Sequence, residues 1–103
     1  MIQMKRNECL RLIRPSNRKI NIIRYSESES KEHIEMKEKV CQKLLEEGKH
    51  FVTEAIFGNG MRADIVCLDD FRVIEIANTE TEKSLVKKRI DYPRGLIIEV
   101  VRC

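Results

Sequence analysis

The stretch that most constrains the fold is residues 52–78, in which three short apolar runs are separated by two turn signals. The runs are rich in Val, Ile and Phe, and the turns fall at residues 58–60 (Gly-Asn-Gly) and 69–70 (Asp-Asp). Short runs of this kind, bounded by Gly, Asn and Asp, are typical of strands. We therefore predict a three-stranded meander over residues 52–78.

The two turns also predict how the strands are aligned. A two-residue hairpin loop at the second turn places Val66 opposite Val73 and Asp64 opposite Glu75. A three-residue loop at the first turn places Glu54 opposite Asp64. In this register Glu54, Asp64 and Glu75 form one row across one face of the sheet.

This row of acids predicts a cation site. Like charges directly opposite each other on adjacent strands destabilise a sheet, so a bound cation would explain the row. Carboxylate oxygens are ligands that Mg²⁺ prefers, and Mn²⁺ could take its place. The alternative is that the acids are simply solvated, and a one-residue slip of register would place them on different faces.

Charge is distributed unevenly along the 103 residues. Residues 1–25 contain seven basic residues and one acid, whereas the remainder contains 13 basic and 16 acidic residues. A basic arm (residues 1–25) ahead of an acidic domain (residues 26–103) predicts a polyanionic partner such as nucleic acid. The alternative is an ordinary solvated arm.

Several classes of protein are not expected. No apolar run approaches the roughly 18 residues of a membrane span, and residues 1–6 lack the apolar core of a secretory signal. We therefore expect an intracellular protein, in the cytoplasm or inside an infected host cell. The four cysteines form no C-x-x-C pair, which argues against a zinc ribbon, and Cys41 and Cys67 fall in apolar patterns typical of buried thiols.

The remaining elements are predicted from periodicity and turn residues. Residues 19–25 (KINIIRY) favour a strand, and the serines of residues 26–30 are good caps for a helix over residues 31–47 that ends at Gly48. His33 and Lys37 share one face of this helix and are possible contributors to a site. The alternative is that they border the core with their polar ends in solvent, as such side chains usually do.

A second helix is predicted over residues 80–91, with Asn78 or Thr79 as its cap. Its polar side carries Lys83, Lys87, Lys88 and Arg89. The nearly continuous apolar run of residues 96–101 (LIIEVV) predicts a buried strand.

The order of helix, three antiparallel strands, helix and strand resembles the PD-(D/E)XK nuclease superfamily, which includes restriction endonucleases, archaeal Holliday-junction resolvases and viral nucleases. The resemblance covers roughly residues 31–101 and is carried by residues 60–66 (GMRADIV) and 73–77 (VIEIA). It implies an α/β protein with a restriction-endonuclease-like α-β-β-β-α-β core, in which helices flank a central mixed sheet. The basic N-terminal extension, with its own strand, lies outside this core.

The resemblance also implies roles for particular residues. Asp64 is similar to the central metal ligand, and Glu75 to the acid of the E-x-K element. The first helix of the family often adds a Glu, here Glu35 or Glu38, and Glu54 is an alternative from the first strand. Ala77 stands where the lysine of E-x-K is expected, so Lys87, Lys88 or Arg62 is the candidate replacement.

The activity implied is Mg²⁺-dependent hydrolysis of phosphodiester bonds in DNA, with RNA as the alternative, by an endonuclease-like homodimer. Recognition of structure or ends is expected, because no base-reading module is visible. The residues expected to hold the nucleic-acid backbone are Arg18, Lys19, Arg62, Lys83 and Arg89. The alternatives are an inactive nucleic-acid-binding or assembly module on the same fold, and an interaction protein without a nucleic-acid role.

Overall fold

The computed structural model describes residues 2–77 and 82–103 and confirms an α/β architecture. After α1 (Ile2–Arg11) and the short 3-10 helix η1 (Pro15–Asn17), the chain forms α2 (Lys31–Glu46). Three strands follow, β1 (Phe51–Ile56), β2 (Arg62–Cys67) and β3 (Arg72–Ala77). The last elements are α3 (Glu82–Asp91) and β4 (Ile97–Arg102). From α2 onward this is the predicted order of elements.

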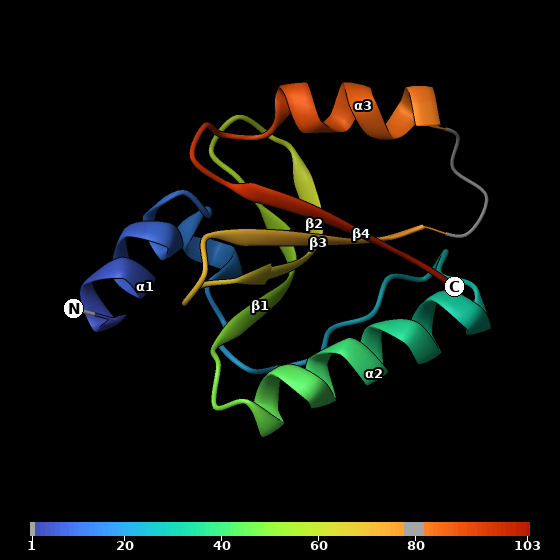
Figure 1. Ribbon diagram of the computed structural model, residues 1–103, viewed down its shortest axis with the longest axis horizontal. Coiled ribbons are helices and arrows are strands. Elements are labelled where there is room, and N and C mark those ends of the chain that lie inside the picture. Colours follow the sequence, from blue (N-terminus) through green and yellow to red (C-terminus); the bar gives the residue numbers. More distant parts are fainter. Residues whose placement is uncertain (1, 78–81) are drawn as a thin grey trace.

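The four strands form one mixed sheet in the order β1-β2-β3-β4. The first three are antiparallel neighbours, and β4 lies parallel to β3 after the crossover through α3. Figure 1 shows α2 on one side of the sheet and α3 on the other. The predicted mixed sheet flanked by helices is therefore confirmed.

Both predicted hairpin registers are confirmed. Val66 pairs with Val73, and Ala55 pairs with Ala63, which is the alignment that places Glu54 opposite Asp64. The β1–β2 ladder nevertheless omits Glu54 and Asp64 themselves, and Glu54 has a positive φ of 49°. A non-glycine residue with positive φ departs from the regular pleat, so the two strands separate locally at this pair.

Apolar side chains pack on both faces of the sheet. Beneath α2, Cys41 and Leu44 contact a layer that includes Phe51, Ile65 and Ile74. The opposite layer contains Val52, Val66 and Val73, together with residues of the N-terminal segment and Tyr92. The predicted burial of Cys41 and Cys67 is confirmed, since both are 0% exposed.

The N-terminal segment differs from the prediction. Residues 19–25 do not form a strand, so that expectation is wrong. They follow the edge of β1 through a mixture of contacts, in which the hydroxyl of Thr53 accepts from the Arg24 N–H and donates to the carbonyl of Ile22, both at 2.8 Å. At this point the Thr53 side chain takes the place of the backbone hydrogen bonds that would join two paired strands. Cys9 and Ile13, farther upstream, are buried in the core.

The predicted burial of the last strand is also wrong. Because β4 is the terminal strand of the sheet, several of its side chains stay in solvent, and Ile97 is 61% exposed. An apolar run alone does not distinguish a central strand from an edge strand. The predicted caps of the second helix, Asn78 and Thr79, lie outside the described residues.

Among the helices of the described ranges, none has the length and apolar character needed to cross a membrane.

Candidate functional site

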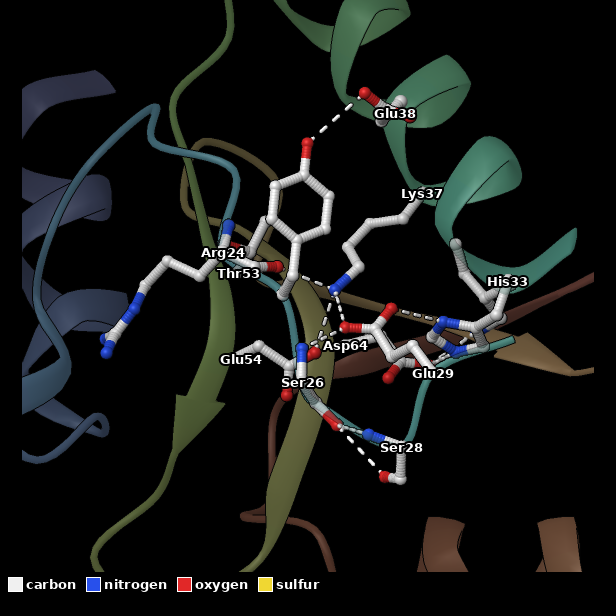
Figure 2. Close-up of polar contacts among 12 residues, drawn as sticks. Arg24, Ser26, Ser28, Glu29, His33, Lys37, Glu38, Thr53, Glu54 and Asp64 are labelled. Carbon is white, nitrogen blue, oxygen red and sulfur yellow. Dashed lines mark hydrogen bonds and ion pairs between the residues drawn. The ribbon is translucent and has the colours of Figure 1, made fainter. Parts of the chain in front are cut away.

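The site is organised by the N-terminal half of α2. Ser30 caps this helix, and its hydroxyl accepts a hydrogen bond from the N–H of His33 at 3.1 Å. Glu29, His33 and Lys37 are spaced by four residues, so they lie along one line of the helix and of the turn before it. Figure 2 shows these three side chains converging on Glu54 and Asp64 from the sheet.

Lys37 is the centre of this cluster. Its side chain is 0% exposed, and its ammonium donates to the carbonyl of Arg24 (2.7 Å), to Glu29 Oε1 (2.6 Å) and to Glu54 Oε1 (2.9 Å). Burial alone would lower the pKa of Lys37, but its hydrogen bonds to Glu29 and Glu54 outweigh burial and raise that pKa. An ammonium has three N–H donors, so Lys37 is saturated by these partners.

Glu29 connects the two basic side chains of the helix. One of its oxygens accepts from Lys37 and the Ser26 N–H, and the other lies 2.7 Å from His33 Nδ1. Burial would raise the pKa of Glu29, but these hydrogen bonds, with Lys37 first, lower it below its ordinary value. Glu29 is therefore held as a carboxylate.

His33 lies between two carboxylates. Its Nδ1 faces Glu29, and its Nε2 is 3.4 Å from Asp64 Oδ2 (Figure 2). A carboxylate at Nδ1 fixes the orientation of the imidazole ring, as in many catalytic and metal-binding histidines. The other nitrogen is thereby directed to the side of the site where Asp64 lies.

Glu54 and Asp64 reach this site because the β1–β2 ladder is interrupted between them. Asp64 Oδ2 accepts the N–H of Ile76 at 2.8 Å, so a side chain connects β2 to β3 at this point. The second oxygen of each acid, Glu54 Oε2 and Asp64 Oδ1, has no hydrogen-bond partner in residues 2–77 and 82–103. Each acid thus keeps one oxygen available to a ligand.

These two acids open into a pocket of about 330 Å³. Its other lining residues include Glu29, His33 and Arg62. Lys37 does not line it, in agreement with its complete burial. The pocket therefore presents carboxylates, one imidazole and one guanidinium to a ligand, with the lysine behind them.

Glu75 is not brought to this pocket. Its neighbours in β3, Ile74 and Ile76, both pack in the layer beneath α2. Because successive side chains of a strand point to opposite faces, Glu75 lies on the side of α3, where it is 3% exposed. The expected row of three carboxylates on one face is therefore not formed.

The other residues expected at the site lie elsewhere. Glu35 is exposed and pairs with Lys31 at 3.9 Å, and Glu38 accepts a hydrogen bond from the Tyr25 hydroxyl at 3.2 Å. On α3, across the sheet, Lys83 and Lys87 are exposed and Lys88 is partly exposed, so the structure does not bring Lys87 or Lys88 to the pocket as lysine replacements. The side chain of Arg89 lies outside the described residues.

Two basic residues of the N-terminal segment have different surroundings. Arg18 donates to the carbonyl of Ile13 at 2.9 Å, a hydrogen bond within the N-terminal segment itself. Lys19 is exposed. Arg62, at the start of β2, lies at the pocket itself. Of the residues expected to hold a nucleic-acid backbone whose side chains the structure describes, Arg62 is thus the one beside Glu54 and Asp64.

Glu29 is the site residue that the sequence analysis missed. It lies in the segment of residues 26–30 that predicts a helix cap. The sequence nevertheless shows that it precedes His33 by four residues and Lys37 by eight. Two such steps place three side chains on one face of a helix. This spacing was the signal that could have found it.

Two carboxylates of the site, Glu54 and Asp64, are the candidate ligands for a divalent cation. Among the described residues, no group of three His, Cys, Asp or Glu side chains is arranged to hold a metal. Mg²⁺, however, commonly uses one or two carboxylates and completes its coordination with waters and substrate phosphates. Glu54 and Asp64 each offer one oxygen of the required type.

Comparisons of the chain with models of protein families, with curated proteins and with solved structures found no match.

Proposed function

We propose that this chain is a metal-dependent phosphodiesterase that hydrolyses nucleic acid, DNA in the first instance, at the pocket between α2 and the β1–β2 pair. One observation carries the proposal. Glu54 and Asp64 leave the strand ladder at the same point and turn an oxygen each toward a pocket that also contains His33 and Arg62. The resemblance of the sequence to PD-(D/E)XK nucleases supports the same chemistry.

Each residue of the site has a distinct role in this proposal. Glu54 and Asp64 would hold Mg²⁺, which would polarise the phosphate and lower the pKa of a bound water. His33, oriented by Glu29, accepts a proton at Nε2 from the attacking water. Arg62 binds the negatively charged phosphate.

Lys37 is a positioning residue in this account. Its three donors are already used within the protein, so it does not contact the substrate. Its hydrogen bonds lower the pKa of Glu29 and hold the side chains of Glu29 and Glu54 in place.

The second candidate is a nucleic-acid-binding module without hydrolytic activity. It is favoured by Ala77 and by the saturated lysine, because neither supplies a cation that touches the reacting phosphate. Binding without cleavage in Mg²⁺ and Mn²⁺ would support this candidate.

Cleavage of end-labelled single-stranded, duplex and branched DNA, with Mg²⁺, Mn²⁺ or EDTA, tests the proposal. Wild-type protein is expected to cleave only with a metal, and Asp64→Asn is expected to abolish cleavage. Glu35→Gln is the matched control, because Glu35 is an exposed acid of the same helix outside the pocket. Cleavage that persists in EDTA, or in Asp64→Asn, would contradict the proposal.

A further inference from the structure

A second hollow adjoins the pocket and is not used by the chemistry described above. It has a volume of about 550 Å³ and shares Glu54 and Arg62 with the pocket of about 330 Å³. Its own lining includes Arg24 and Tyr25. The two hollows adjoin at these shared residues, and we refer to them together as the groove, with Tyr25 in one hollow and Asp64 in the other.

We propose that this groove binds an unpaired stretch of a nucleic-acid strand, with one base stacked on Tyr25 and the backbone held by Arg24 and Arg62. The inference rests on the proposed function, and it names the substrate class as single-stranded segments. The phosphate that follows the stacked base would then lie at Glu54 and Asp64.

Tyr25 is held in a way that suits a stacking platform. Its hydroxyl donates to Glu38, and the ammonium of the buried Lys37 lies 5.5 Å from its ring centroid. The ring is thus fixed from the side of the protein, while the residue remains 53% exposed at the hollow. Exposed aromatic rings beside a basic groove are how proteins bind single strands, because every base has a face that stacks.

The two arginines provide complementary charge. Both are exposed, and neither guanidinium has an ion pair or hydrogen bond to a residue in the described ranges. Figure 2 shows the guanidinium of Arg24 directed away from the Lys37 cluster. The hollow is also lined by Glu27 and Glu54, so the two uncommitted guanidinium groups, and not the net charge of the lining, would bind the phosphate oxygens.

A single strand is favoured over a duplex for two reasons. Stacking on a side chain requires a base that is not already stacked and paired in a helix. The volume of the hollow, about 550 Å³, also lies in the range that proteins use for small ligands, of the order of one nucleotide. A duplex would reach the arginines only through its backbone and would leave Tyr25 unused.

Fluorescence anisotropy with a labelled oligothymidylate and with a duplex, both in EDTA to prevent cleavage, tests the inference. The single strand is expected to bind more tightly than the duplex. Tyr25→Ala is expected to weaken single-strand binding about 5- to 100-fold, and Tyr25→Phe to retain most of it, because the phenyl ring still stacks. The double variant Arg24→Ala/Arg62→Ala should reduce the magnitude of the slope of log K against log salt by about 1.4, whereas Arg94→Ala, at an exposed position that does not line the groove, should not.

Cleavage assays on the same variants separate this inference from the proposed function. If single-strand binding depends on Tyr25, but neither wild-type protein nor any variant cleaves DNA, the groove assignment is supported and the phosphodiesterase proposal fails. If wild-type protein cleaves DNA but Tyr25→Ala binds and cleaves single strands normally, the groove assignment fails and the phosphodiesterase proposal stands. Failure of the wild-type protein to bind the oligothymidylate, or equal binding of single strand and duplex, would overturn the inference.

Discussion

The site depends on one buried lysine. Removing an ammonium from water is costly, and Lys37 is stable in the core because two carboxylates and a carbonyl take the place of water around it. Its two acidic partners would in turn repel each other without it. Lys37, Glu29 and Glu54 therefore behave as one unit, in which removal of one charge leaves the others uncompensated.

Lys37→Met should consequently destabilise the protein strongly. Loss of one partner from a buried ionic group costs about 3–5 kcal/mol, and urea unfolding measures that loss directly. Lys39→Met, at an exposed position of the same helix, is the control and should change the free energy of unfolding by less than about 0.5 kcal/mol. A loss below about 1 kcal/mol in Lys37→Met would contradict the description of the cluster.

The stability of the protein should fall at acid pH through Glu29. The folded-state pKa of Glu29 is lowered from an ordinary value of 4.5, so its contribution is complete above pH 4.5 and is lost as the pH falls through the folded-state pKa. Urea unfolding at a series of pH values should show a flatter acid limb in Glu29→Gln than in wild type. An unchanged acid limb in Glu29→Gln, with Glu35→Gln as control, would exclude this origin.

Lys37 should make the stability of the protein fall at alkaline pH, in contrast to Glu29. Its folded-state pKa is raised from an ordinary value of 10.5, so its contribution is complete below pH 10.5 and is lost as the pH rises through the folded-state pKa. Wild-type protein should therefore lose stability in strong alkali, and Lys37→Met should have lost this dependence. Equal alkaline limbs in urea unfolding of the two proteins would count against the assignment.

Helix α2 is the element that brings the site together. Its N-terminus is fixed by Ser30, which places His33 in the first turn, and Gly48, with φ of 71°, follows its end as the sequence predicted. The strands contribute Glu54 and Asp64 only because their ladder is interrupted. The site thus combines one regular element with one local departure from regularity.

Ser30→Ala should cost about 0.5–2 kcal/mol, because the N–H of His33 loses its capping partner. The matched control is Ser28→Ala, which removes a hydroxyl from an exposed loop position two residues earlier. Urea unfolding of both variants is the measurement. Equal effects of the two substitutions would show that Ser30 does not cap the helix.

Part of the fold is predictable from the sequence. The turn residues predict both hairpin registers, and periodicity predicts the order of the elements from α2 onward. The positive φ of Glu54 could not be predicted, because a non-glycine residue seldom adopts one. The expected row with Glu75 fails for the same reason, since it requires regular alternation through the pair of Glu54 and Asp64, where the ladder is interrupted.

At the scale of the whole molecule, the N-terminal segment is part of the core. Cys9 and Ile13 are at most 1% exposed and pack with the sheet on the side opposite α2. The sequence suggested a separate basic arm because charge dominates its composition. Its few apolar residues carry the packing, and a charge count does not reveal them.

The reactivity of the thiols should report this packing. Burial raises the pKa of Cys9 and of Cys41 to about 12, and it raises that of Cys67 as well, whereas Cys103 is exposed. Native protein should therefore react quickly with a maleimide at Cys103 alone, and Cys103→Ser should react slowly until urea is added. Fast native labelling of Cys9 in mass spectra would show that α1 is not packed on the sheet.

The central claim is that Glu54 and Asp64 form a phosphodiesterase site, and single-turnover cleavage tests it most directly. A labelled single strand is incubated with saturating protein and Mg²⁺, so that the rate reports chemistry and not binding. We predict cleavage by wild-type protein and by Glu35→Gln, and a loss of at least about 100-fold in Asp64→Asn with binding retained. Equal rates in wild type and Asp64→Asn, or no cleavage by wild type with bound DNA, would contradict the account.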